Sequence, residues 1–277
     1  MTIALAISPR PSRTQLFFRA TGIIGLGLTA IAVAWADFIA RMPAGLGDAR
    51  FVSLPPSGQL PFGTDVIGRD VLSETLHGFS LTAEQAAVGA LIAVAFGHAG
   101  GFFVARLRFH LGDLLRWIAE VLCEFPALVI AILLVAITHR SMAPFAAGFA
   151  VTPVAFARSF DRARTLLAAP HAEFARATGV YSSTLLRRDL VHEFRNRLAS
   201  IFGHAIAAVA IILSTLSFVG FGAAPPHRDL GLMIAGAFAN AHATHNYTAW
   251  WAVLFPSLAL TFIVLCAKLA AIPDETT

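Results

Sequence analysis

Lysine is almost absent from this chain of 277 residues, which contains only one, Lys268. A Walker A loop needs a Gly-Lys-Ser/Thr run to hold nucleotide phosphates, so the sequence excludes a P-loop ATPase. Cysteine is scarce as well: Cys123 and Cys266 both fall within apolar stretches, so a disulfide framework is not indicated. Charged residues make up 13% of the chain, against about 25% in an ordinary soluble domain.

Hydrophobic residues are correspondingly frequent. Hydrophobic residues make up 57% of the chain, and the mean hydropathy is +0.73. A soluble fold of this length could not bury so much apolar surface, so a polytopic membrane protein is expected. The pI of about 9.8 comes from arginines that flank the apolar stretches instead of forming one stripe, so nucleic-acid binding is not indicated.

Six apolar segments approach the length of about 20 residues that a helix needs to cross a bilayer. They are Ala20–Ile39, Ala83–Ala105, Trp117–Ile137, Met142–Ala157, Leu198–Phe221 and Ala249–Ala271. The fourth is short and contains two prolines, which neighbouring helices can accommodate. The predicted fold class is therefore all-α: a polytopic membrane protein with six transmembrane helices.

The first of these segments also has features of a secretory signal peptide. Arg10, Arg13 and Arg19 precede it, and Ala34-Trp35-Ala36 fits a small-x-small cleavage site. Its apolar run is longer than a signal core, however, and the rest of the chain is also apolar. We therefore predict an uncleaved first span.

The basic residues predict the orientation. With the N-terminus inside, 15 of the 20 lysines and arginines fall in cytoplasmic parts and five in external loops. Because basic residues concentrate on the cytoplasmic side of membrane proteins, both termini are predicted to be inside.

This topology divides the chain into four parts. Residues 1–19 are predicted to be a cytoplasmic N-terminal tail, 20–79 the first span with an external cap loop, 80–271 the transmembrane domain, and 272–277 a C-terminal tail. Within the transmembrane domain, residues 158–197 are the long cytoplasmic loop between spans four and five. Two sizeable loops are predicted to be external. Arg41–Thr82 contains prolines and glycines and is expected to be an irregular cap, and Ala223–Thr248 contains a Pro-Pro pair and histidines.

Three sequence blocks are distinctive. The first, Phe62–Ser73, reads FGTDVIGRDVLS and precedes the second span. The second, Glu173–Gly179, reads EFARATG and lies in the long cytoplasmic loop. The third, Leu216–Gly222, reads LSFVGFG and is followed by a Pro-Pro pair and GLMI. Phe125-Pro126 stands within the third span.

Together these blocks resemble the oligopeptide/dipeptide/nickel branch of ABC-importer permeases, specifically the C-type subunit, from about Pro61 to Leu269. The second block resembles the cytoplasmic "EAA" loop with which such permeases contact their ATPases. The chain departs from the family pattern at Phe174, which replaces an alanine, and at Leu230, which replaces a tryptophan. Val191-His192-Glu193 replaces the family's Leu-Pro-Asn, so the helix-ending proline is missing.

The resemblance implies a coupling helix that seats in a groove of the ATPase. In that role, small residues such as Ala175 allow close approach of the backbones, Gly179 permits a turn, and Glu173 favours a helix N-terminus. The implied coupling residues are Glu173, Phe174, Ala175, Arg176, Gly179, Leu185, Leu186 and Arg188. The alternative is an ordinary solvated loop whose arginines only mark the cytoplasmic side.

The first block has two interpretations. Asp65 or Asp70 could pair with Arg69 and hold the external cap together, with Gly63 and Gly68 as turn residues. Alternatively, these residues contact a docked binding protein. A phosphate-binding glycine loop is not supported, because no predicted strand precedes it.

Two further groups carry charge or possible metal ligands. Glu120 and Glu124 lie one helical turn apart, just before Phe125 and Pro126, and either pair structurally or line the transport path. His242-x-x-His245 has metal-ligand spacing but no cysteine or carboxylate partner, so no metal site is predicted. No catalytic arrangement is identifiable from spacing.

The resemblance implies a non-enzymatic subunit of a bacterial inner-membrane importer. Its partners would be a second permease in a heterodimer, two ATP-binding subunits that hold ATP and Mg, and an extracytoplasmic solute-binding protein. The chain itself would bind no cofactor. Peptides are the implied cargo, with nickel or a metal chelate as the alternative. A secondary transporter or channel would show inverted repeats and charges near the bilayer centre, and an intramembrane enzyme would need convergent catalytic groups; neither pattern is evident.

Overall fold

The computed structural model describes residues 13–40, 45–107, 109–169, 182–223, 227–244 and 249–272. Apart from one isolated bridge between Thr64 and Asp70, the regular structure in these ranges is helical, which agrees with the predicted all-α class. The α-helices are α1 (Arg13–Ile39), α2 (Val71–Ile92), α3 (Gly100–Val104), α4 (Phe109–Cys123), α5 (Ala127–Ile137), α6 (Ala143–Leu167), α8 (Ser182–Phe218), α9 (Leu230–Thr244) and α10 (Trp251–Ala270). Short 3-10 turns, η1 (Ala49–Phe51) and η3 (Arg140–Met142), precede α2 and α6.

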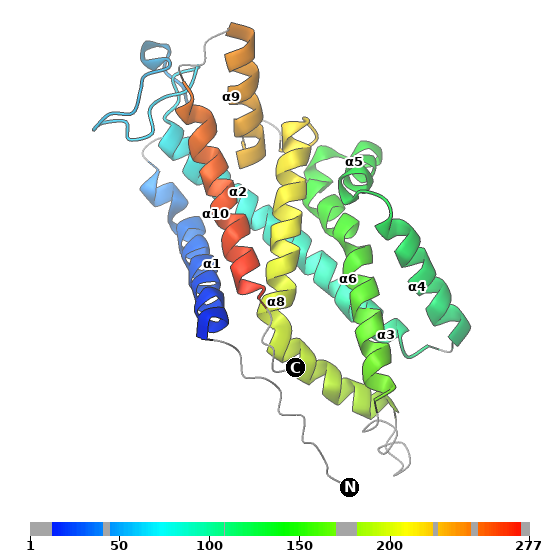
Figure 1. Ribbon diagram of the computed structural model, residues 1–277. Coiled ribbons are helices and arrows are strands. Elements are labelled where there is room, and N and C mark those ends of the chain that lie inside the picture. The colour runs from blue at the N-terminus through cyan, green and yellow to red at the C-terminus, as the bar shows by residue number, and fades with distance from the viewer. Residues whose placement is uncertain are drawn as a thin grey trace.

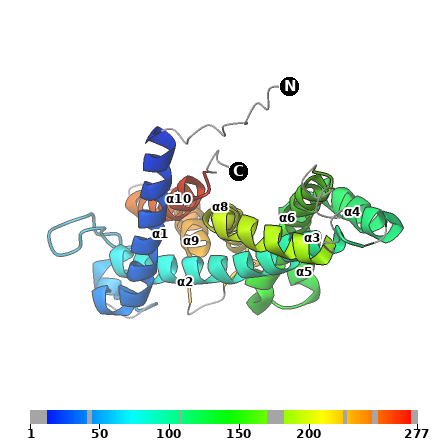
Figure 2. The same cartoon turned by 90° about the horizontal axis from the view of Figure 1, so that it is seen from below.

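The long helices run between two ends of the molecule (Figure 1). One end holds the start of α1, the ends of α6 and α10, and the start of α8; we call it the inner end. The opposite end holds the loop of residues 45–70 together with α9, and we call it the outer end. Figure 2 shows α2 running along the length of the molecule, with α1 and α10 towards one side and α4 and α6 towards the other.

Four helical segments in the described ranges are long and apolar enough to cross a membrane. They are Arg13–Ala36, Val71–Val104, Ala199–Phe218 and Trp251–Ala270. A fifth is added if the pair α4 and α5 counts as one bent span. The prediction of a polytopic membrane protein is confirmed at this level.

The third predicted span, Trp117–Ile137, is not one helix. It breaks after Cys123, and α4 and α5 meet at 95°. Pro126 is the cause, because proline has no N–H to donate and disfavours helical geometry at the residue before it, Phe125. The break leaves α5 a short helix of eleven apolar residues.

Other boundaries also differ from the predictions. The second span starts at Val71 instead of Ala83, and it passes through a π-helical turn, η2 (Ala93–Ala99), into α3. The predicted external loop between spans five and six, Ala223–Thr248, contains the helix α9. In both cases an aspartate immediately before the helix accepts a hydrogen bond from an N–H group in the first turn of the helix. Aspartate is common both in loops and as a helix cap, so the sequence alone does not show where these helices begin.

The predicted cytoplasmic loop, 158–197, is mostly helical in the parts that the structure describes. Its beginning continues α6 as far as Leu167, and its end belongs to α8, which starts at Ser182. Figure 1 shows this first part of α8 lying across the inner end before the helix turns towards the outer end.

Close packing between helices depends on glycine. A Cβ added at Gly89 of α2 would lie 2.8 Å from the carbonyl oxygen of Pro144 in α6 and 2.6 Å from Val209 of α8. At Gly22 and Gly25 of α1, an added Cβ would collide with α10. Small residues allow such approach where lipid removes the hydrophobic drive between helices, and dispersion contacts must supply the association energy.

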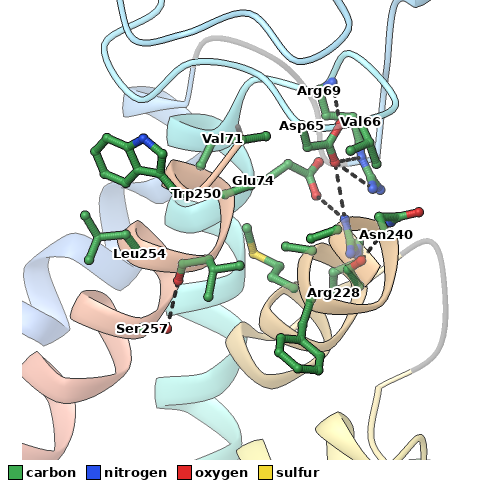
Figure 3. Close-up of a pocket in the computed structure, with 18 residues that line it drawn as sticks. Asp65, Val66, Arg69, Val71, Glu74, Arg228, Asn240, Trp250, Leu254 and Ser257 are labelled. Carbon is green, nitrogen blue, oxygen red and sulfur yellow. Dashed lines mark hydrogen bonds and ion pairs between the residues drawn. The ribbon is translucent and has the colours of Figure 1, made fainter. Parts of the chain in front are cut away.

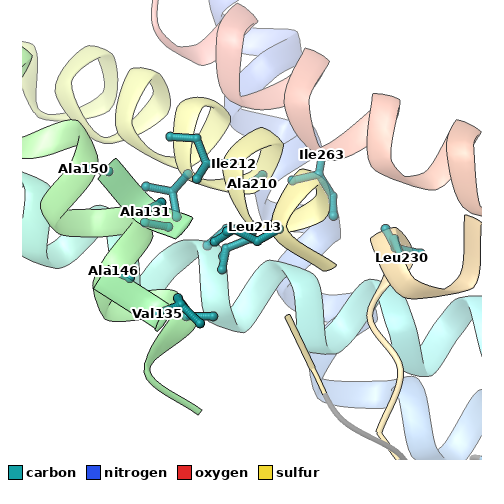
Figure 4. Close-up of a cluster of buried hydrophobic side chains, with 14 of the residues drawn as sticks. Ala131, Val135, Ala146, Ala150, Ala210, Ile212, Leu213, Leu230 and Ile263 are labelled. Atoms are coloured by element: carbon teal, nitrogen blue, oxygen red, sulfur yellow. The ribbon is translucent and has the colours of Figure 1, made fainter. Parts of the chain in front are cut away.

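The main buried cluster surrounds α8 (Figure 4). Leu213 of α8 is 1% exposed, and it packs in a cluster with alanines of α5 and α6. Ile263 of α10 and Leu230 of α9 complete the cluster on the other side of α8. The helix that leaves the predicted cytoplasmic loop is therefore also the centre of the bundle.

We expect Gly89→Leu to destabilise the protein, because a side chain has no room between α2, α6 and α8; overpacking of this kind costs about 1–3 kcal/mol. Gly27→Leu is the matched control, since no atom lies within 4 Å of a Cβ added there. Both changes raise helix propensity equally, so only packing separates them. Thermal unfolding in detergent should show a lower midpoint for Gly89→Leu alone, and equal midpoints would contradict this account of the packing.

Candidate functional site

The loop of the first sequence block closes around Asp65. Its carboxylate accepts hydrogen bonds from the backbone N–H of Ile67 at 2.9 Å and of Arg69 at 3.0 Å. The Arg69 guanidinium donates to the same carboxylate from Nε at 2.8 Å and forms an ion pair through Nη2. Of the two carboxylates considered as partners of Arg69, Asp65 makes the pair. Asp70 instead caps α2, where it accepts from Ser73 N at 3.2 Å.

The two glycines of this block are required by the backbone. Gly63 and Gly68 have φ of 68° and 78°, which L side chains rarely adopt. A Cβ at Gly63 would also lie 2.6 Å from the Leu54 carbonyl oxygen, and one at Gly68 would collide with the backbone of Asp48. The loop therefore has one compact conformation.

Two aromatic contacts fix the loop to α10. The indole N–H of Trp251 donates to the Thr64 carbonyl oxygen at 2.9 Å. The ring of Phe62 stacks on that of Phe255, with centroids 3.8 Å apart and planes 6° from parallel. Trp251 is 5% exposed, so this contact is part of the protein interior.

Arg228 brings the loop together with α9 and α2. Its guanidinium lies 3.8 Å from the Asp65 carboxylate and 3.9 Å from that of Glu74 in α2. Burial, and next the positive charge of Arg69, lower the pKa of Arg228. Glu74 is 5% exposed and accepts the Gly45 N–H at 2.5 Å. Sequence reasoning missed Arg228 and Glu74 as partners; the available signal for Arg228 was the charged pair Arg228-Asp229, which follows His227 shortly after the Pro-Pro of the third block.

Asp229, next in the chain, joins α9 to α8. Its carboxylate accepts the Leu232 N–H at 2.8 Å, which caps α9, and it accepts the hydroxyl of Ser217 near the end of α8. The Leu230 N–H donates to Thr82 Oγ1 of α2 at 3.1 Å. Burial raises the pKa of Asp229, against these hydrogen bonds, which lower it. The first and third sequence blocks thus meet at one junction at the outer end.

A cavity of about 440 Å³ lies beside this junction (Figure 3). Its charged wall is formed by Asp65, Arg69, Glu74 and Arg228, and its apolar walls come from α9 and α10. The apolar and neutral lining residues are Val66, Val71, Met233, Gly236, Ala237, Phe238, Asn240, Ala241, Ala249, Trp250, Ala252, Val253, Leu254 and Ser257. A volume of this size with a few convergent polar groups is typical of a ligand site.

Ion pairs connect α4 to α6 nearer the inner end. Arg116 forms two parallel hydrogen bonds with Asp161, each 2.9 Å long, and a 2.7 Å ion pair with Glu120. Arg164 pairs with Asp113 at 3.3 Å. The bidentate geometry fixes the two helices in one relative position. For Glu120, the geometry favours structural pairing over a place in a transport path.

Comparison with known proteins shows the family. Residues 97–271 match the family described as binding-protein-dependent transport system inner membrane component. The chain belongs to this family. It is therefore a permease of a binding-protein-dependent ABC importer, a non-catalytic subunit located in the inner membrane, and the readings as a secondary transporter or an intramembrane enzyme are excluded.

Several curated permeases are similar to this one. A putative peptide transport system permease protein of Brucella suis is 28% identical over 254 residues, which cover 90% of this chain and 82% of that one. A glutathione transport system permease protein of Pectobacterium atrosepticum is 29% identical with the same coverage. A dipeptide transport system permease protein of Haemophilus influenzae is 26% identical over 257 residues, covering 90% of this chain and 85% of that one.

The residues predicted to couple the permease to its ATPases lie mostly outside the described structure. Glu173, Phe174, Ala175, Arg176 and Gly179 lie in the undescribed segment between α6 and α8. The remaining three, Leu185, Leu186 and Arg188, lie on the first turns of α8. Their assignment remains a prediction.

The remaining predicted residues have ordinary surroundings. Glu124 and Phe125 are exposed at the break between α4 and α5, where Pro126 precedes α5. His242 contacts the Phe238 ring edge-to-face, with centroids 4.4 Å apart, and His245 lies outside the described residues. Within the described ranges, no group of three or more His, Cys, Asp or Glu is arranged to hold a metal ion.

We expect Asp65→Asn to destabilise the permease strongly, because it leaves two partly buried arginines without their shared anion; breaking a buried pair costs about 3–5 kcal/mol, to be discounted for its partial exposure. The control is Asp48→Asn, whose partner Arg50 is 82% exposed and held outside the junction. Thermal unfolding should separate the two variants. A small effect at Asp65 equal to that at Asp48 would show that the junction does not depend on this charge.

Proposed function

We propose that this permease forms the path of a peptide importer, crosses the membrane six times with both termini inside, and couples to its ATPases through residues 158–197. The observation that carries the proposal is the direction of the chain. The start of α1, the end of α10, the end of α6 and the start of α8 share the inner end (Figure 1), and 15 of the 20 lysines and arginines belong to segments predicted to face inward. Charge bias and chain direction thus point to the same orientation.

The structure gives six crossings only if two irregular regions are each counted as one crossing. The pair α4 and α5 would count as one crossing despite its bend, and α6 as another. α6 is 25 residues long, and only its second part is polar, with Arg158, Asp161, Arg162 and Arg164. A polar end of this kind would extend beyond the bilayer on the cytoplasmic side.

The proposed mechanism uses α8 as the moving element. The coupling loop would sit on an ATPase, and α8 leads from that loop through the core to Ser217. When ATP binding closes the ATPases, displacement of the loop would be transmitted along α8 to the outer junction. The permease would then alternate between outward-open and inward-open states together with a second permease.

The proposed cargo class is peptides. The similar permeases carry names that refer to peptide, dipeptide and glutathione transport. A solute-binding protein would deliver the peptide at the outer end, and two ATP-binding subunits would supply ATP and Mg at the inner end. The family description requires a binding protein, while the composition of the complex is our proposal.

Cysteine labelling tests the orientation. In a background with Cys123 and Cys266 replaced, a cysteine at Ser57 should react with an impermeant maleimide in intact cells. A cysteine at Ala168, at the end of α6, should react only after permeabilisation. The reverse pattern would refute both the orientation and the position of the coupling loop.

Charge reversal in the loop tests the coupling. Glu173→Arg would place a like charge near Arg176 and Arg188, and Gly179→Val would resist the turn because a β-branched residue disfavours positive φ. Both should keep membrane insertion and abolish peptide uptake, with weaker recovery of the ATPase subunits in pull-downs. Asp48→Arg, the same reversal on the outer loop, is the control and should recover the ATPases normally. Full uptake and recovery in both loop variants would refute the coupling proposal.

A further inference from the structure

The cavity at the outer junction combines an apolar chamber with a charged wall. Its volume of about 440 Å³ suits one or two amino-acid side chains and lies within the range of small-ligand sites. Trp250 is 58% exposed and Leu254 39% exposed, and both belong to the lining. Figure 3 shows these two apolar side chains on one side of the cavity, with Arg69 and Arg228 on the other.

The four charged groups of the wall are not equally satisfied. Arg69 is held by Asp65 at hydrogen-bonding distance, and Glu74 accepts the Gly45 N–H. Arg228 lies 3.8 and 3.9 Å from its two carboxylates, which is beyond the 2.7–2.9 Å of a charge-assisted hydrogen bond. A guanidinium at this distance keeps donor capacity for a third anion on the cavity side.

Small residues of α9 line the cavity beside this guanidinium. The Arg228 guanidinium packs against Gly236 of α9, and glycine is what permits this contact, because an added Cβ would be 2.7 Å from Nη2. The following turn presents Ala237 and Ala241 to the cavity. Small residues therefore separate the guanidinium from the exposed surfaces of Trp250 and Leu254 across the chamber.

We propose that this cavity binds the C-terminal end of a peptide whose last residue is apolar. The terminal carboxylate would accept hydrogen bonds from Arg228 in the fork geometry that guanidinium and carboxylate share. The last side chain would occupy the chamber against Trp250 and Leu254. The proposal rests on the proposed peptide import and adds to it a subsite on the permease that selects for a free carboxylate next to an apolar group.

The test is equilibrium binding to the full transporter in nanodiscs, with its ATPases and second permease but without the binding protein. The probes are the dipeptide Ala-Phe, its C-terminal amide, and octanoate. Ala-Phe should bind at least about tenfold more tightly than its amide, because the amide cannot accept a charge-assisted hydrogen bond from Arg228. Equal binding of acid and amide, or no binding of Ala-Phe, would overturn the proposal.

Variants locate the binding in the cavity. Arg228→Lys keeps the charge but loses the fork, so it should weaken Ala-Phe about tenfold and leave the amide unchanged. Ala241→Leu fills the chamber without touching a charge, so it should weaken both ligands. Arg50→Lys, on the exposed side of the same loop, is the control and should bind like the unmodified protein. Unchanged Ala-Phe binding in both cavity variants would overturn the assignment.

Octanoate separates the two sources of an apolar carboxylate. If octanoate binds much more weakly than Ala-Phe, the cavity is a peptide site. If octanoate saturates the cavity and prevents Ala-Phe from binding, the site is for a fatty amphiphile and the proposal is overturned.

Failure of the subsite is also distinct from failure of the proposed function. A transporter that imports peptides normally while Arg228→Lys binds Ala-Phe unchanged would refute only the subsite, whereas absence of ATP-driven peptide uptake would refute the function itself.

Discussion

The outer half of the molecule depends on the buried carboxylate of Asp229. It accepts hydrogen bonds from Ser217 of α8 and from the first turn of α9, and the next residue in the chain donates to Thr82 of α2. Because a carboxylate that is 2% exposed cannot exchange these partners for bulk water, losing one of them would leave a polar group unsatisfied at a cost of about 1–3 kcal/mol or more. The Asp229 side chain therefore joins α8 to α9, and the backbone of the next residue joins α9 to α2.

That junction gives α8 a particular position in the protein. The helix starts within the predicted coupling loop, passes through the main apolar cluster, and ends one residue after Ser217, which donates to Asp229. Arg228, adjacent to Asp229, contacts the loop that Asp65 closes and forms part of the cavity wall. A displacement of α8 would thus reach the cavity through covalently adjacent residues, without a separate chain of contacts.

Sequence analysis found the elements that are determined locally. Continuous apolar runs located α1, α10 and the second part of α8. The first block indicated an ion pair of Arg69 with Asp65 or Asp70, and the structure shows that Asp65 is the partner. Sequence analysis failed where tertiary contacts decide. Hydropathy does not distinguish the bent pair α4 and α5 from one straight span, nor the helix α9 from an apolar loop. Glu74 and Arg228 come together only because α9 folds back onto α2. A helix-capping aspartate such as Asp70 cannot be distinguished in sequence from an aspartate in a loop, unless the start of the helix is already known.

The distribution of polar contacts indicates which parts can move. Bidentate hydrogen bonds join α4 to α6, and Asp229 joins α8 to α9, so each pair is held in one geometry. Between these pairs, α6 meets α8 in a cluster of alanines, leucine and valine, whose contacts are not directional. Packed helices can slide past one another by small amounts where their contacts are smooth and apolar, but not where charge-assisted hydrogen bonds fix them. We therefore expect the alternation between states to occur as shear between the pair α4–α6 and the pair α8–α9, with the cavity moving together with the second pair.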